Sequence, residues 1–103
     1  MEQSGGRQAP QDRIRSRKNL EGLVAPSELA GDSILDTVGL YCPIPIIKTA
    51  QRIAGAPAGH VVEVLSDDRV ILVDMPAWCL ANGHAYLGYR EEAGQWRLFV
   101  RKQ

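Results

Sequence analysis

The sequence has little or none of several features that mark whole classes of protein. Its 103 residues include only two cysteines, with no Cys-x-x-Cys pair, and two isolated histidines, His60 and His84, so neither a disulfide scaffold nor a familiar metal cage is predicted. The formal net charge is zero, whereas a nucleic-acid-binding protein would show a basic excess. No apolar run approaches the length of a membrane span. We therefore expect no metal, no cofactor, no direct nucleic-acid binding and no membrane span.

The first 31 residues differ in composition from the rest of the chain. They contain no aromatic residue and begin with a segment rich in Gln, Gly, Arg and Ser. Such a segment has too little apolar surface to offset the entropy that ordering costs, so we expect residues 1–31 to be a mostly disordered tail. Residues 32–103 then form one small domain. Because the N-terminus lacks the charged start, apolar stretch and cleavage site of an export signal, we expect the protein to be cytoplasmic.

The spacing of apolar residues after the tail predicts six secondary-structure elements. In chain order these are a strand at 33–38, a helix at 43–54, a strand at 60–65, a helix that follows Asp67-Asp68 and stops at Asn82-Gly83, and two strands at 85–90 and 96–100 joined by a loop at 91–95. Pro76 should bend or delay the second helix. With right-handed crossovers, the order β-α-β-α-β-β gives an α/β two-layer sandwich, a four-stranded mixed sheet with both helices on one face. The other sheet face should stay partly open to solvent or a partner.

Cys42 lies where the first strand pattern ends and the first helix pattern begins, within the segment Gly39–Pro45. Pro43 fits the first helical position and Pro45 the first turn, so the two prolines should fix the helix start and the direction of the sulfur. Unpaired N–H groups and the macrodipole at a helix start favour a thiolate over a thiol. Because neither proline carries an N–H, that of Ile44 is the nearest donor for a sulfur anion. We interpret Cys42 as a sulfur nucleophile or sulfur acceptor; the alternative is an unreactive cysteine buried at a helix entrance.

Cys79 lies on the apolar side of the second helix pattern, next to Trp78. We interpret it as a buried structural cysteine, and the alternative is a resolving thiol that forms a disulfide with Cys42. Trp78 and Trp96 are interpreted as packing residues. Both histidines are interpreted as polar residues at the ends of elements.

The segments around the two cysteines resemble those of the TusA-like (SirA/YedF-like) sulfur-carrier family. The segment Gly39–Pro45 is similar to the family's Cys-Pro-x-Pro signature. The pair Asp67-Asp68, followed by the segment Asp74–Cys79, resembles its second block. The similarity spans about residues 34–102 and leaves the tail outside.

This resemblance implies a fold shared with the C-terminal domain of a bacterial translation initiation factor, and a sulfurtransferase that acts with partner proteins. Cys42 would accept sulfane sulfur as a persulfide from a cysteine desulfurase or a rhodanese-like donor. It would relay the sulfur to an acceptor protein for tRNA thiolation, cofactor sulfuration or sulfur oxidation. From their own sequence context, Asp67, Asp68 and Asp74 are cap and turn residues that hold the second helix beside Cys42, with Pro76 as further support.

Three positions depart from the family pattern. Family members that modify tRNA often carry an acidic residue where this chain has Ile44, and often a proline where it has Arg69. The stretch Val70–Val73 is more apolar than usual. These positions lie where a partner would touch, so the donor, the acceptor and the pathway stay open. Two other functions also remain open: a thiol redox or regulatory protein in which Cys42 is oxidised, and a non-catalytic module that binds a partner through the open sheet face or the tail.

Overall fold

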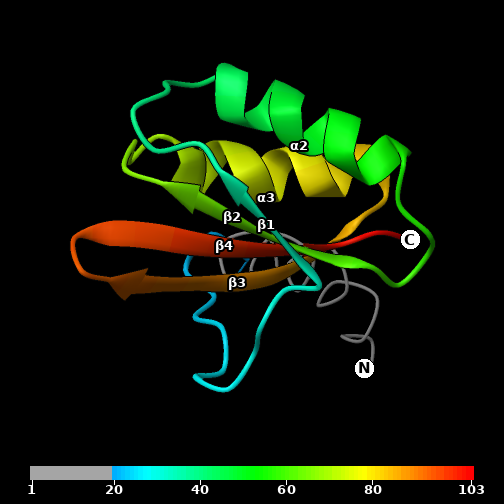
Figure 1. The fold of residues 1–103 in the computed structure, drawn as a ribbon, viewed down its shortest axis with the longest axis horizontal. Helices are drawn as coiled ribbons and strands as arrows, with labels where there is room; N and C mark the ends of the chain where they lie inside the picture. The colour runs from blue at the N-terminus through cyan, green and yellow to red at the C-terminus, as the bar shows by residue number, and fades with distance from the viewer. Residues whose placement is uncertain (1–19) are drawn as a thin grey trace, which may run out of the picture.

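The computed structural model describes residues 20–103, which form one sheet covered by two helices (Figure 1). In chain order the elements are β1 (Ser33–Asp36), α2 (Ile44–Ala54), β2 (Val61–Ser66), α3 (Ile71–Asn82), β3 (Ala85–Glu92) and β4 (Gln95–Arg101). The predicted order β-α-β-α-β-β is confirmed. Within the described residues, neither helix is long and apolar enough to cross a membrane.

The four strands lie in the order β1-β2-β4-β3. β1 pairs with β2 in parallel, while β4 pairs antiparallel with both β2 and β3, so the sheet is mixed. Figure 1 shows α2 and α3 together on one face of the sheet. The predicted two-layer α/β sandwich is therefore confirmed.

The hydrophobic core lies between the sheet and the two helices. Alternate residues of the central strands face the helices, because successive side chains of a strand point to opposite faces. The buried cluster consists of Ile53, Val62, Val64, Ile71, Met75, Cys79, Tyr86, Leu98 and Val100. α3 runs unbroken through Pro76, which is itself buried, and ends at Gly83 in the left-handed conformation (φ 75°).

The hairpin between β3 and β4 is tighter than predicted. Glu92 pairs with Gln95, and only Ala93 and Gly94 connect the strands, at φ 53° and 79°. Two positive φ values in a two-residue loop match the twist of the flanking strands. The predicted loop at 91–95 is therefore wrong, because an alanine at positive φ gives no recognisable turn signal.

Residues 20–31, here called the strap, do not behave as the predicted free tail. Tyr89 of the edge strand β3 donates its N–H to Leu23 O (3.0 Å) and accepts the Ala25 N–H on its own carbonyl (2.8 Å). The strap then runs along the sheet face opposite the helices to reach β1 (Figure 1). Residues 20–31 therefore follow the sheet instead of belonging to a disordered tail, and residues 1–19 lie outside the described part of the chain. The strap covers part of the second sheet face, and Ile34 on that face is 55% exposed, so the face is only partly open.

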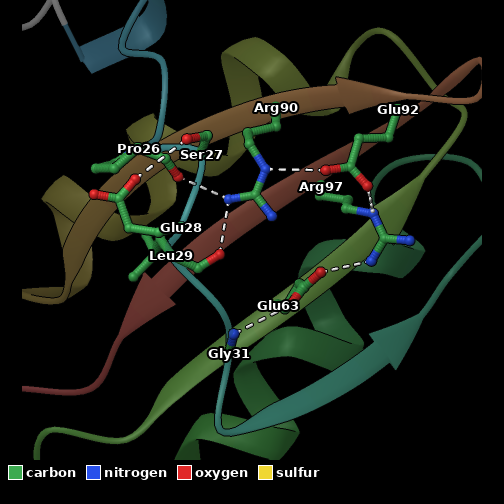
Figure 2. A network of polar contacts seen from close by, with 9 residues as sticks. All are labelled: Pro26, Ser27, Glu28, Leu29, Gly31, Glu63, Arg90, Glu92 and Arg97. Carbon is green, nitrogen blue, oxygen red and sulfur yellow. Dashed lines mark hydrogen bonds and ion pairs between the residues drawn. The ribbon is translucent and has the colours of Figure 1, made fainter.

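A charged network fixes the strap to the sheet (Figure 2). Arg90 donates from one guanidinium nitrogen to Pro26 O (2.8 Å) and Leu29 O (2.7 Å), and its side chain lies over the Phe99 ring. Arg90 also pairs with Glu92 (3.1 Å). The strap is thus bound through its own carbonyl groups to a side chain of β3.

Glu63 of β2 holds the last part of the strap. Its carboxylate accepts the Gly31 N–H (3.1 Å) and pairs with Arg97 (2.6 Å), which also pairs with Glu92 (2.9 Å). A Cβ at Gly31 would meet the Glu63 Cβ at 2.6 Å, so only glycine permits this close approach.

The stability of the fold should depend on the ionisation of Glu63. Burial would raise the pKa of this carboxyl, but the Gly31 and Arg97 hydrogen bonds and the Arg97 and Arg90 charges outweigh burial and lower the pKa below 4.5. A carboxyl whose pKa is lower in the folded state stabilises the fold at any pH above its pKa in the unfolded chain. That stability is lost as the pH falls through the pKa of the folded state. We expect the free energy of unfolding to decrease below a pH of about 4.5, and Glu63→Gln to flatten this decrease.

Urea unfolding of both proteins between about pH 3 and pH 7 measures this effect. The exposed neighbour Glu91 provides a control, because Glu91→Gln removes a carboxylate that holds no part of the strap. If the Glu63→Gln variant loses stability at acid pH as steeply as the wild type does, the assignment to Glu63 is contradicted.

Candidate functional site

Cys42 lies in the loop between β1 and α2, at the edge of the hydrophobic core. The residue is half-buried, and its side chain packs against the core cluster without being sealed inside it. α2 begins at Ile44, one position later than the sequence predicted. Pro43 is therefore the cap residue, and Pro45 lies in the first turn. The Ile44 N–H donates to Tyr41 O (2.9 Å). It is therefore not available to the sulfur, and that part of the prediction is wrong.

Two aspartates of the β2–α3 loop hold the Cys42 loop in place. The Gly39 N–H donates to Asp67 Oδ1 (3.0 Å), and the Cys42 N–H donates to Asp68 Oδ2 (2.9 Å). Gly39 adopts φ 88°, which other residues rarely reach. Because β1 and β2 are parallel neighbours, the loops at their carboxyl ends meet at one edge of the sheet. The aspartates thus link the two loops, whereas the cap residue of α3 is Val70, which makes no side-chain cap hydrogen bond.

Asp68 and Asp74 face the Cys42 thiol from two sides. Asp68 Oδ1 accepts the Val70 N–H (3.1 Å), and Asp74 lies in the first turn of α3. The pKa of the Cys42 thiol is raised from 9.0 to about 11. Burial is the largest cause, and the nearby carboxylates of Asp74 and Asp68 follow. The predicted thiolate is therefore wrong for the free protein: burial and two nearby carboxylates outweigh the start of α2.

A raised pKa predicts a slowly reacting thiol. Because Cys42 titrates near 11 instead of 9.0, its thiolate fraction at neutral pH is about 100-fold smaller than that of an ordinary cysteine. We expect the rate of alkylation by iodoacetamide to rise about tenfold per pH unit between about pH 7 and pH 10. Intact-protein mass spectrometry measures this rate. A plateau below about pH 9 would contradict the raised pKa.

The structure places the other candidate residues away from the sulfur or in packing roles. Cys79 is 1% exposed within the core, and burial raises its pKa to about 12. Trp78 stacks on His84 with ring centroids 5.3 Å apart, and His60 Nε2 lies 3.0 Å from Ser33 Oγ. Over residues 20–103, no group of three His, Cys, Asp or Glu residues could hold a metal ion. A resolving role for Cys79 and a supporting role for Pro76 stay predictions.

Sequence reasoning missed two properties of this surface. It found no general base, although the structure brings Asp74, far along the chain, to the thiol. It also did not show that Ile47 of α2 is exposed although it is apolar, while α2 buries Pro45, Thr49 and Ile53. The signal that was present is the apolar character of Ile44 and of Val70–Val73.

Several large apolar side chains near Cys42 in the chain, and near the two aspartates of the site, are exposed. They come from the loop before α2, from the first turn of α2 and from the start of α3. We call them the apolar rim: Tyr41, Ile44, Ile47, Val70 and Val73, between 42% and 73% exposed. Tyr41 and Ile44 flank Cys42 and Pro43 along the chain, and Val70 and Val73 belong to the segment that carries Asp68 and Asp74. The two carboxylates near the thiol therefore have exposed apolar side chains next to them.

This domain is similar to several known proteins. Residues 33–102 match the family model described as sulfurtransferase TusA. The sulfur carrier protein TusA of Pseudomonas entomophila is 35% identical over 77 residues, which cover 75% of this chain and 96% of that protein. YrkF of Bacillus subtilis is 42% identical over 69 residues, 67% of this chain but only 37% of YrkF. The crystal structure of a SirA-like protein from Desulfitobacterium hafniense has a TM-score of 0.60 at 25% identity, covering 67% of this chain and 95% of that one.

The chain therefore belongs to the TusA family of sulfurtransferases, and the resemblance predicted from the sequence is confirmed. The family match includes Cys42 and both loops beside it. It begins at residue 33, so the strap lies outside the matched range.

Proposed function

We propose that this chain is a sulfur carrier that holds sulfane sulfur as a persulfide on Cys42 and relays it to an acceptor protein. The observation that carries the proposal is the position of Cys42 at the sheet edge, half-buried, with its backbone N–H bonded to Asp68 and with the carboxylates of Asp74 and Asp68 close enough to raise the pKa of its thiol. A thiol at this edge can be reached by a second protein, and the carboxylates beside it can accept its proton.

Loading follows as one balanced exchange. The Cys42 sulfur attacks the outer sulfur of a persulfide on the donor protein, and the Cys42 proton passes to the Asp74 carboxylate. A new sulfur–sulfur bond forms on Cys42 while the donor's sulfur–sulfur bond breaks, and the donor cysteine leaves as a thiolate. In the second exchange an acceptor thiolate takes the outer sulfur and Cys42 is restored. No net oxidation or reduction occurs in either step.

The raised pKa supports a carrier over a redox sensor. Cysteines that sense oxidants combine a low pKa with exposure, whereas the Cys42 pKa is raised to about 11. A protonated thiol resists adventitious oxidation, which suits a carrier that should react only when a partner docks.

The partners in this proposal are a cysteine desulfurase or rhodanese-like donor and a protein acceptor. The acceptor serves tRNA thiolation, cofactor sulfuration or sulfur oxidation, and apolar Ile44 gives no preference for the first of these. We place the carrier in the cytoplasm, where a reducing environment keeps both cysteines as free thiols.

Sulfur uptake tests the proposal directly. We expect incubation with a cysteine desulfurase and cysteine, or with a rhodanese and thiosulfate, to add about 32 Da, the mass of one sulfur atom, to the intact protein. Dithiothreitol should remove the added mass, and prior alkylation of Cys42 should prevent it. Cys79→Ser should load as the wild type does. An unchanged mass with both donor systems would contradict the proposal.

A further inference from the structure

We infer that the protein that docks over Cys42 carries a cationic side chain next to its own reactive sulfur, set in an apolar surface. This inference rests on the proposed function, because it describes the partner in the sulfur exchange. It combines two features of the same surface, the apolar rim and the carboxylates of Asp68 and Asp74.

The apolar rim calls for an apolar partner surface. Tyr41 is 73% exposed, and Val70 and Val73 are each 53% exposed, all beside the residues that contact the thiol. Burial of such side chains is what stabilises a protein–protein contact, and the centre of an interface is usually depleted in charge. A partner that reaches the half-buried sulfur meets Tyr41 beside it in the chain, and Val70 and Val73 beside the two aspartates.

Among residues 20–103, no Lys, Arg or His side chain forms an ion pair with Asp68 or Asp74. Within residues 20–103 the ion pairs join Arg90, Arg97, Glu63 and Glu92 on the opposite sheet face. The nearest basic residue in sequence, Arg69, extends over the Trp96 ring instead, 5.7 Å from its centroid. Asp68 cannot move away, because it accepts the Cys42 and Val70 N–H groups and its own N–H is bonded to Ser66 Oγ (3.0 Å).

Docking therefore requires charge compensation. When an apolar partner surface covers Asp68 and Asp74, it removes their water, and an unpaired buried carboxylate is strongly unfavourable. A Lys, Arg or His⁺ side chain from the partner replaces that water. The same cation offsets the two negative charges that hold the proton on Cys42, so the thiol becomes reactive only in the complex. It also stabilises the thiolate that leaves the donor.

Two thiol reagents with the same reactive group and opposite charges test the electrostatic part of the inference, on the protein with all 103 residues. Trimethylammonioethyl methanethiosulfonate is cationic and sulfonatoethyl methanethiosulfonate is anionic; both modify Cys42 by thiol exchange. We expect the cationic reagent to react at least about tenfold faster at low salt, after normalisation to 2-mercaptoethanol. Asp74→Asn and Asp68→Asn should each lower this ratio several-fold.

Glu28→Gln is the control, because it removes one exposed carboxylate from the strap, on the sheet face opposite the helices, and keeps the oxygen that accepts from Ser27. It should leave the ratio within about twofold. Cys42→Ala should not react. A wild-type ratio near one, or a ratio that Asp74→Asn does not change, would overturn the inference.

The apolar part is tested by sulfur loading from the donor used above. Val73→Ser should slow loading several-fold without changing the reaction with the small reagents. Leu80→Ser removes an equally exposed apolar side chain farther along α3 and should load normally. Equal loading rates for the two variants would overturn the apolar half of the partner surface.

The two proposals fail in different ways. Loading without a charge preference contradicts the partner inference and leaves the carrier function standing. A charge preference without any loading contradicts the carrier function, and with it the sulfur-exchange partner.

Discussion

Cys42→Ala is expected to abolish sulfur uptake and to leave the fold intact. No other residue can replace the lost sulfur, because Cys79 is 1% exposed and its pKa lies near 12. The loop should survive, since the bond to Asp68 comes from the backbone N–H of residue 42, which alanine keeps. We expect a change in the free energy of unfolding below about 1 kcal/mol.

Intact-protein mass spectrometry after incubation with the donor system measures the loss, and thermal unfolding measures the fold. Cys42→Ser is the closer control for shape, because its hydroxyl is nearly isosteric but is not a sulfur nucleophile. It should also gain no mass. Sulfur recovered on the alanine variant would contradict the assignment of Cys42.

Gly88→Ala is expected to destabilise the fold strongly, although it adds only a single methyl group. Gly88 in β3 has φ 109°, and a Cβ there would meet Ala25 N at 2.8 Å and Leu23 O at 2.9 Å. Both contacts are to the backbone of the strap, which can relieve them only by moving away from β3. The strain and the overlap together should cost about 2–4 kcal/mol of unfolding free energy.

Urea unfolding measures this loss, and hydrogen exchange at the Ala25 and Tyr89 amides reports whether the strap has separated from β3. Gly55→Ala is the matched control, because its Cβ would have no neighbour closer than 4.0 Å and its φ is −93°. It should change the stability by less than about 0.5 kcal/mol. Equal stabilities for the two variants would contradict the close approach of the strap.

The order of elements could be predicted because the apolar pattern changes its period at each boundary. The helix Ile44–Ala54 and the stop at Gly83 both follow from local residues, so they needed no knowledge of the rest of the fold. The strap could not be found this way. Its contacts are backbone hydrogen bonds to Tyr89 and carbonyl groups bound by Arg90, and neither leaves a recognisable pattern in the side chains of residues 20–31.

The functional site, like the fold, could be predicted only in part. The position of Cys42 and the presence of Asp67, Asp68 and Asp74 could be read from sequence, but their distances could not. The raised pKa of the thiol depends first on its burial and then on two carboxylates from another loop and helix, and both follow from the packing of the fold and not from the residues around Cys42. Local rules for a helix start therefore gave the wrong direction for the pKa.

The strap also determines how the domain can be cut. A fragment limited to the family-matched residues 33–102 would lose every backbone partner that the strap gives to Tyr89 and would uncover the face on which Phe99 lies. An unpaired outer edge beside a newly exposed aromatic ring is a template for strand addition between molecules. Versions of this protein that lack the strap should therefore self-associate more than the chain that keeps it.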